Sequence, residues 1–192
     1  MTTATALIVV GILIVVAAIA WYFGLQHRST RLRTRFGPEY DRAMQDYGSR
    51  TKAEEALVAR ERRREKLNIH SLTPGQRERF AEQWHNVQSR FVDDPAGSIQ
   101  DADRLVMDVM KTRGYPMAEF DHRAEDLSVD YPHVVRNYRQ AHDIAIRHER
   151  GQATTEDLRK AMVCYRELFD ELLESRVREA RDVREVHEEI RR

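Results

Sequence analysis

The chain lacks cysteine pairs and the residue spacings typical of zinc and phosphate sites. Cys164 is the only cysteine among 192 residues, so no disulfide can form within the chain. No Cys and His spacing is typical of a zinc site, and no glycine-rich loop is typical of phosphate binding. One cysteine agrees with a reducing compartment, although many proteins outside the cytoplasm also lack disulfides. We therefore predict no metal and no cofactor.

Signals for β-strands are also scarce. No run alternates between apolar and polar residues with a period of two, and none is rich in β-branched residues. There is no internal repeat or low-complexity block. The sequence predicts an all-α protein, and its short loops favour sequential helices that lie antiparallel in a helical bundle.

Charge is missing from the N-terminal region, where no Lys, Arg, Asp or Glu precedes Arg28. The twenty uncharged residues from Ala6 to Leu25 have the length that a helix needs to cross ~30 Å of hydrocarbon. We predict a transmembrane helix over residues 6–25, after a short tail of residues 1–5. Aromatic and basic residues at and after its end are the expected contacts with the lipid bilayer: Trp21, Tyr22, Arg28, Arg31, Arg33 and Arg35.

The positive charges that follow this helix predict a cytoplasmic C-terminal domain and an N-terminus outside the cell. A cleaved secretory signal is the alternative, because Ala18-Ile19-Ala20 offers small residues at a cleavage site. Cleavage after Ala20 would give a secreted soluble helical protein. Against it, Met1 to Thr5 has no basic side chain, and the apolar run is longer than a signal core of ~7–15 residues.

The formal net charge is zero but unevenly distributed. Residues 28–66 hold twelve Lys and Arg against seven Asp and Glu, and residues 67–192 hold the acidic excess. Attraction to anionic lipid explains a basic segment next to the membrane. The densest basic group lies between Arg60 and Lys66, where Glu61 and Glu65 interrupt it. It predicts a solvated, ion-paired helix face, with lipid contact and, less favoured, nucleic-acid contact as alternatives.

Helix signals divide the rest of the chain. Gly37-Pro38 interrupts a helix that leaves the bilayer, and the next two helices are expected from Pro38 to Tyr47 and from Ser49 to about Leu67. Even the most apolar face of the second helix consists mostly of small or charged residues. We therefore expect a solvated, basic juxtamembrane stalk over residues 26–67.

A helical bundle is expected over residues 68–175. Thr73 to Gln76 predicts a capping box, followed by a helix with an apolar face that includes Trp84 and Phe91. Further helices are expected from Asp94 to Gly114, around Phe120 to Leu127, from Val134 to Gly151, and from Thr154 onward. We expect Trp84 and Phe91 to pack on the apolar stripe of the long last helix: Leu158, Tyr165, Phe169 and Leu172.

Residues 176–192 are expected to form a charged helical extension. Arg176 interrupts the apolar stripe, and beyond it only a narrow seam continues: Ala180, Val183, His187 and Ile190. Such a seam is compatible with a short two-chain coil, and hence with a homo-oligomer. A frayed, solvated tail is the alternative.

Three helix junctions carry aromatic, acidic and basic residues beside proline, at residues 91–95, 113–116 and 126–132. They predict a shared binding surface where the junctions meet, with capping and corner-making as the alternative. The candidate residues, with two from the helix after the third junction, are Asp93, Asp94, Arg113, Tyr115, Asp126, Ser128, Asp130, Tyr131, Tyr138 and His142.

His142 lies on the apolar face of its helix, so a buried, hydrogen-bonded core histidine is expected. An enzyme with a site near His142, Tyr138 and the Asp126 to Pro132 corner is the alternative. Two Glu-x-x-His pairs, Glu82 with His85 and Glu119 with His122, have the spacing of di-iron helical bundles. On a helical wheel they point away from the apolar faces, which predicts solvated side chains.

In combination, five motifs resemble an uncharacterised family of bacterial single-pass membrane or secreted proteins: Arg35 to Arg42 (RFGPEYDR), Phe91 to Pro95 (FVDDP), Arg113 to Pro116 (RGYP), Asp126 to Pro132 (DLSVDYP) and Tyr138 to His142 (YRQAH). The resemblance covers most of the chain after residue 25 and implies no known activity or catalytic residue. The sequence therefore predicts a membrane-anchored cytoplasmic binding or scaffolding module with an unidentified protein partner.

Overall fold

The protein is all-α within the residues that the computed structural model describes, which are 13, 16 and 26–190, with side chains through Glu174. The predicted anchor over residues 6–25, with Trp21 and Tyr22, lies outside the described residues except for Leu13 and Val16. In the described part, no helix is both long enough and apolar enough to cross a membrane.

The chain forms two compact units, Met1–Val58 and Ala59–Arg192. The described part of unit 1 contains a helical segment over residues 26–36, α2 (Pro38–Tyr47) and the first part of α3 (Arg50–Glu65). Tyr40 Oη donates to Glu54 Oε1 at 3.0 Å and lies 3.1 Å from Ser29 Oγ, so one buried tyrosine links the three helices of this unit.

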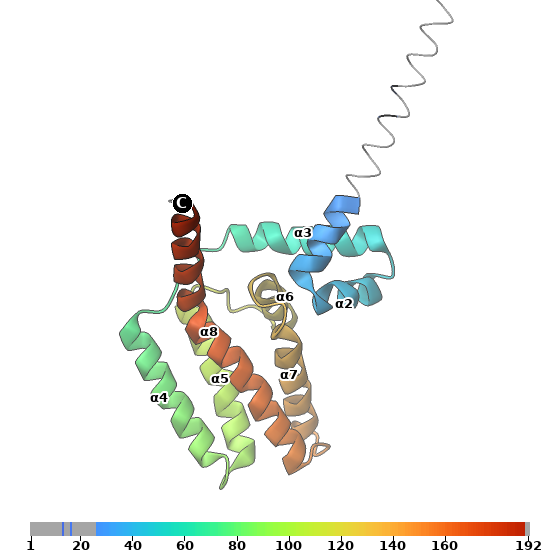
Figure 1. The fold of residues 1–192 in the computed structure, drawn as a ribbon. Helices are drawn as coiled ribbons and strands as arrows, with labels where there is room; N and C mark the ends of the chain where they lie inside the picture. Colours follow the sequence, from blue (N-terminus) through green and yellow to red (C-terminus); the bar gives the residue numbers. More distant parts are fainter. Residues whose placement is uncertain (1–12, 14–15, 17–25, 191–192) are drawn as a thin grey trace, which may run out of the picture. The chain divides into compact units, whose positions relative to one another are not determined.

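Unit 2 contains the end of α3 and five further helices: α4 (Pro74–Arg90), α5 (Pro95–Thr112), α6 (Phe120–Asp130), α7 (Val135–Glu149) and α8 (Thr155–Ile190). Figure 1 shows α8 between α5 and α7, with α4 beside α5. Short turns connect α4 to α5 and α7 to α8, so each of these pairs runs antiparallel.

The predicted caps begin the helices of unit 2. Thr73 and Gln76 form a capping box, in which Gln76 N donates to Thr73 Oγ1 and Thr73 N donates to Gln76 Oε1. Asp157 N donates to Thr154 Oγ1 at 3.2 Å at the start of α8. These side chains satisfy backbone N–H groups that a helix start leaves unpaired.

The core of unit 2 contains the apolar faces that the sequence predicted. Trp84 of α4 is 5% exposed and stacks on Phe169 of α8, with ring centroids 4.6 Å apart. This contact confirms the expected packing of the tryptophan on the last helix. Phe91, expected in the same face, is partly buried against the core, and Leu105 of α5 and Ile144 of α7 are also buried core residues.

Two expectations about the helices are wrong. The third junction was placed at residues 126–132, yet α6 continues to Asp130 and buries Asp126, Ser128 and Val129. The stalk over residues 26–67 was expected to be solvated, yet Leu57 of α3 is buried and the boundary between the units falls inside α3, after Val58. Helix α3 is not a solvated stalk because Leu57 is buried in unit 1 and carboxylates of α6, described below, bind arginines at the end of the helix.

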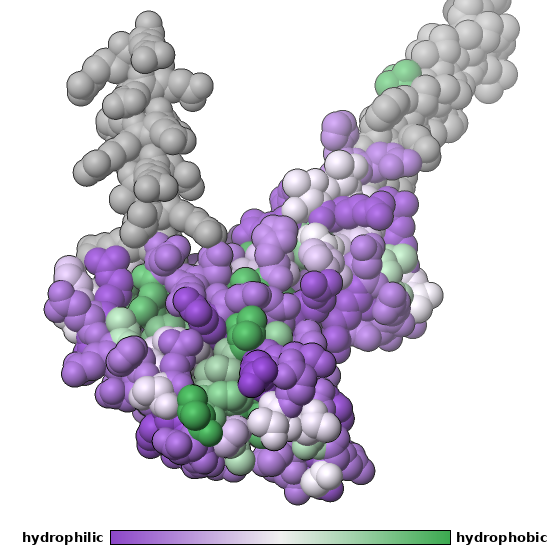
Figure 2. Space-filling view, turned by 60° about the horizontal axis from the view of Figure 1, so that its bottom comes forward, coloured by the Kyte–Doolittle hydropathy of each residue, from purple (hydrophilic) through white to green (hydrophobic). Residues whose placement is uncertain are grey.

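Hydrophilic residues cover most of the face of the molecule in Figure 2, with apolar residues in a narrow band. Among the side chains of unit 2 that the structure describes, the large apolar residues that are well exposed are Val92, Met117 and Val163, which come from different elements. Helix α8 continues to Ile190, but the side chains of the predicted seam over residues 176–192 lie outside the described ones.

Candidate functional site

Arg113 joins three segments of unit 2 that are distant in the sequence. It follows α5 directly and is 3% exposed. Its Nε donates to the carbonyl oxygen of His70 at 3.3 Å, and its Nη1 donates to the carbonyl oxygen of Leu172 at 3.1 Å and to Tyr131 Oη. The guanidinium also lies over the Tyr131 ring, 5.6 Å from its centroid. A buried arginine thus connects the α3–α4 linker, the start of the α6–α7 junction and α8.

The α3–α4 linker contacts the end of α5 through backbone atoms. His70 N donates to the carbonyl oxygen of Arg113 at 2.9 Å. Gly114 has φ of 93°, and a Cβ at this position would lie 2.4 Å from the carbonyl oxygen of Asn68. Only glycine fits here, because both the left-handed conformation and the close approach exclude a side chain.

Asp130, at the end of α6, receives hydrogen bonds from two other elements. Arg64 Nε of α3 donates to both carboxylate oxygens, at 2.9 and 2.7 Å, and Tyr115 Oη donates to Oδ2 at 2.6 Å. Burial opposes the charge of Arg64, but the hydrogen bond and the charge of Asp130 raise the pKa of its guanidinium. Burial and the Asp130 charge raise the pKa of Tyr115, so its hydroxyl stays protonated and acts as the donor.

Two more arginines of α3 bind carboxylates of α6. Arg63 Nε donates to Asp126 Oδ1 at 2.7 Å and Arg63 Nη2 donates to Glu125 Oε2 at 2.8 Å. Arg60 Nη2 donates to Glu125 Oε1 at 3.1 Å. The basic group is ion-paired, as predicted, but the expected solvated face is wrong for Arg60, which is 6% exposed. Its partners come from another helix, which covers it.

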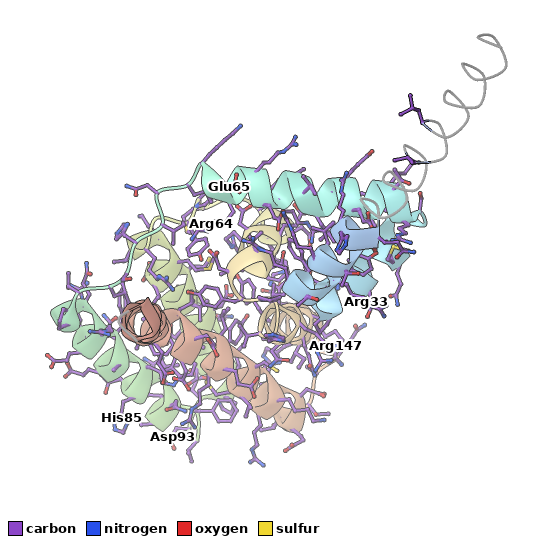
Figure 3. The ribbon with its side chains drawn as sticks, turned by 45° about the horizontal axis from the view of Figure 1, so that its top comes forward. Arg33, Arg64, Glu65, His85, Asp93 and Arg147 are labelled. Atoms are coloured by element: carbon purple, nitrogen blue, oxygen red, sulfur yellow. The ribbon has the colours of Figure 1, made fainter. Side chains whose placement is uncertain are left out.

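A cavity of about 290 Å³ opens beside Arg113. Its polar lining residues come from α3, the α3–α4 linker, the α6–α7 junction and α8: Arg64, His70, Ser71, Arg113, Asp130, Tyr131, His133 and Glu171. Ile69, Pro132 and Val134 add apolar wall. Figure 3 labels Arg64 near the C-terminal end of α3, next to Glu65.

No family model, curated protein or solved structure matches the chain. The resemblance to an uncharacterised bacterial membrane family therefore stays a prediction.

Two of the three predicted junctions meet at this site. Arg113 and Tyr115 of one junction contact Asp130 and Tyr131 of the other. The buried residues of α6 lie in the same region, and Ser128 Oγ donates to the carbonyl oxygen of Glu125 at 2.6 Å.

The remaining predicted junction, at residues 91–95, lies elsewhere. Asp93 and Asp94 are exposed in the α4–α5 turn, where Asp94 Oδ1 accepts a hydrogen bond from Gly97 N at 2.9 Å and caps α5. Figure 3 shows Asp93 and His85 far from Arg64. Helix capping therefore accounts for Asp94, and the predicted shared surface contains two junctions instead of three.

Tyr138 and His142 belong to a different part of unit 2. Tyr138 is buried, and the centroid of its ring lies 4.8 Å from that of Phe120 and 6.3 Å from that of Tyr165. His142 stacks on Phe120 with 3.5 Å between centroids, but it is only half-buried and makes no hydrogen bond to a described residue. The expected buried, hydrogen-bonded histidine is wrong, because His142 lies at the mouth of a second cavity rather than inside a filled core.

The remaining residues considered in the sequence lie outside the two cavities. Arg28, Arg31, Arg33 and Arg35 are exposed on the helical segment over residues 26–36. The side chains of both Glu-x-x-His pairs, Glu82, His85, Glu119 and His122, are exposed, as the helical wheel predicted. Among the described residues no group of His, Cys, Asp and Glu could hold a metal ion. Burial raises the pKa of the Cys164 thiol, which disfavours the nucleophilic thiolate.

Sequence reasoning missed the residues that complete the cavity: His70, Ser71, His133 and Glu171. No motif marks them, because their place at the cavity depends on the paths of the α3–α4 linker, the α6–α7 junction and α8. It also missed Glu125. A signal for that residue was present in the complementary runs of charge, basic from Arg60 to Arg64 and acidic from Glu125 to Asp130.

Proposed function

We propose that the chain is a membrane-anchored, cytoplasmic binding module, and that unit 2 binds a carboxylate-bearing segment of a partner protein at the cavity beside Arg113. The uncharged stretch over residues 6–25 and the four exposed arginines after it support the anchor and its orientation. The observation that carries the binding site is the meeting of two helix junctions and one linker around a single cavity.

The lining of this cavity holds N–H donors of Arg64 and His133 beside the carboxylates of Asp130 and Glu171. Arg64 uses only Nε to bind Asp130, so its two terminal nitrogens have no partner among the described residues. His133 is exposed and has no polar partner in the described part of the chain. Both Asp130 oxygens already accept hydrogen bonds. A carboxylate supplies two acceptor oxygens and fits the fork of an arginine.

The residues around the cavity form a rigid frame, which suits the binding of a ligand. Its wall residues are fixed by the Arg113 hydrogen bonds and by the ion pairs between α3 and α6, so little ordering is needed when a ligand binds. Cavities of this size occur in proteins as sites for a side chain or a small molecule. A short acidic segment therefore fits better than a large folded surface.

Site-specific photo-crosslinking in membranes tests the proposal. A photoreactive residue replaces His133 in the full chain, and a matched chain carries it at His85, an exposed histidine far from the cavity. We expect a protein adduct from position 133 and none from position 85, with the crosslinked peptide containing Asp, Glu or a C-terminal carboxylate.

A second variant tests the chemistry of recognition. His70→Glu places a negative charge beside the cavity and should lower the adduct yield at position 133, whereas His85→Glu should leave the yield unchanged. Equal adducts from positions 133 and 85, or an adduct yield at position 133 that His70→Glu does not change, would refute binding at this cavity. A chain that begins at Arg28 should lose the adduct if the anchor is needed to meet the partner.

A further inference from the structure

A second cavity of about 250 Å³ lies between α5, α7 and α8 and shares no lining residue with the one beside Arg113. Asp103 comes from α5, His142 and Glu149 from α7, and Tyr165 from α8. Apolar wall comes from Ile99, Ala145 and Ile146. The predicted binding surface and the function proposed above do not use this cavity.

Buried polar atoms at this cavity have no hydrogen-bond partner in the described part of the chain. Tyr165 is 0% exposed and lines the cavity; burial and the neighbouring Asp103 carboxylate raise its pKa, and its hydroxyl makes no well-formed hydrogen bond to a described residue. Asp103 Oδ1 is buried and unpaired in the same lining. The hydroxyl of the neighbouring Tyr138 is unpaired as well. Unpaired buried polar groups destabilise a fold, so a group that binds them contributes to stability.

The charge of the lining is negative. Asp103 and Glu149 contribute carboxylates to the lining, and Glu149 is exposed. Arg104 is largely exposed and pairs with Asp101 at 3.3 Å, which directs its charge away. Burial lowers the pKa of His142, although the charge of Asp103 opposes this, so its ring is neutral near pH 7. The nearby Arg123 does not line the cavity, and its Nη1 donates to the carbonyl oxygen of Ala118 at 2.7 Å.

We propose that this cavity binds a small primary amine in its ammonium form, with a short apolar body. The ammonium has three N–H donors, which match Asp103 Oδ1, the Tyr165 hydroxyl and one further acceptor. Ile99, Ala145 and Ile146 provide the wall for the alkyl part. The stack of His142 on Phe120 holds the imidazole at the cavity mouth. A volume of about 250 Å³ exceeds the ~150 Å³ of a cavity that binds benzene, so it has room for a small amine with a short apolar body.

Titration with n-butylammonium chloride tests the proposal on the full chain in detergent micelles. The readout is the imidazole signal of His142 in protein with ¹³C-labelled histidine, assigned with His142→Gln. We expect a saturable shift with n-butylammonium, and none at equal concentrations of 1-butanol or butyrate, which have similar shapes but are neutral or negative. No saturable shift, or an equal response to all three probes, would overturn the proposal.

Two variants test the named contacts, with Asp108→Asn as the matched control because Asp108 is an exposed carboxylate on the same helix. Asp103→Asn keeps the shape and removes the charge, and should weaken binding at least about tenfold. Tyr165→Phe should weaken binding with little change in the unfolding midpoint of the free protein, because its buried hydroxyl lies near Asp103 without a well-formed hydrogen bond. Unchanged affinity in Asp103→Asn that still unfolds cooperatively would refute the site.

Discussion

Replacing Trp84 by alanine should lower the free energy of unfolding by about 3 kcal/mol. The ring is almost fully buried and stacks on Phe169 at an interplanar angle of 17°. Removing a buried aromatic side chain costs about 3–5 kcal/mol. The indole Nε1 is buried without a partner in the described part of the chain, and removal of such a donor regains part of that cost. The low end of the range is therefore expected.

The assay is urea unfolding of the full chain in detergent, followed by circular dichroism. In a thermal scan, a loss of about 3 kcal/mol corresponds to a lower midpoint by about 6–12 °C for a protein of this size. Trp84→Phe, which keeps an aromatic ring and removes Nε1, should cost clearly less than Trp84→Ala. Val92→Ala, at a side chain that is 84% exposed, should change stability by less than about 0.5 kcal/mol.

A double-mutant cycle isolates the stacking contact. Trp84→Leu and Phe169→Leu, alone and together, should give a coupling energy of about 0.5–1.5 kcal/mol. An unfolding midpoint that Trp84→Ala leaves unchanged would refute the argument that this face forms the core. Additive effects of the two leucine substitutions would refute the stacking contribution but would leave the burial argument intact.

Three further predictions concern charge, topology and association. Burial alone would raise the pKa of Glu125, but Arg60 and Arg63 lower it below its ordinary value of 4.5. The ionised Glu125 side chain therefore stabilises the fold at pH values above 4.5, and this stabilisation is lost as the pH falls below about 4.5. Glu125→Gln should therefore reduce the acid dependence of urea unfolding, and an unchanged dependence would contradict the ion-pair account. A cytoplasmic reporter fused to the C-terminus should be active, and a mature N-terminus at Trp21 would contradict the anchor. Removal of residues 176–192 should leave the midpoint nearly unchanged and reduce crosslinked dimers in membranes; unfolding of the truncated chain would place those residues in the core.

The helices were predictable because their signals are local. Thr73 with Gln76 and Thr154 with Asp157 form the expected caps. Gly48 has a positive φ at the end of α2, as a glycine stop predicts. Apolar side chains at helical spacing identified most of the buried face of each core helix.

The role of α3 was not predictable by the same reasoning. Its hydrophobic periodicity is weak, and the residues that hold its end are arginines whose partners lie more than sixty positions away. Hydrophobic periodicity detects faces that pack through apolar area, and it does not detect a helix held by ion pairs. The opposing charges were visible, but their proximity depends on the tertiary fold.

The candidate site was predictable in part. Successive turns of an antiparallel bundle lie at alternate ends, so the α4–α5 turn with Asp93 lies away from the linker before α4 and the junction after α5. From the order of the helices alone, this rule predicts that Asp94 and Arg113 lie at opposite ends of the bundle. It gives no information about the unpaired polar atoms around Tyr165, which depend on side-chain placement within the core.

Beside the buried side chain of Leu72, contacts through backbone atoms hold the linker between α3 and α4. Arg113 binds the carbonyl oxygen of His70, His70 N binds the carbonyl oxygen of Arg113, and Gly114 leaves room for the Asn68 carbonyl. The identities of residues 68 and 70 are therefore nearly free with respect to folding, whereas Arg113 and Gly114 are not. Related chains can diverge at the cavity edge while keeping the same frame, which would allow ligand preference to evolve without loss of the fold.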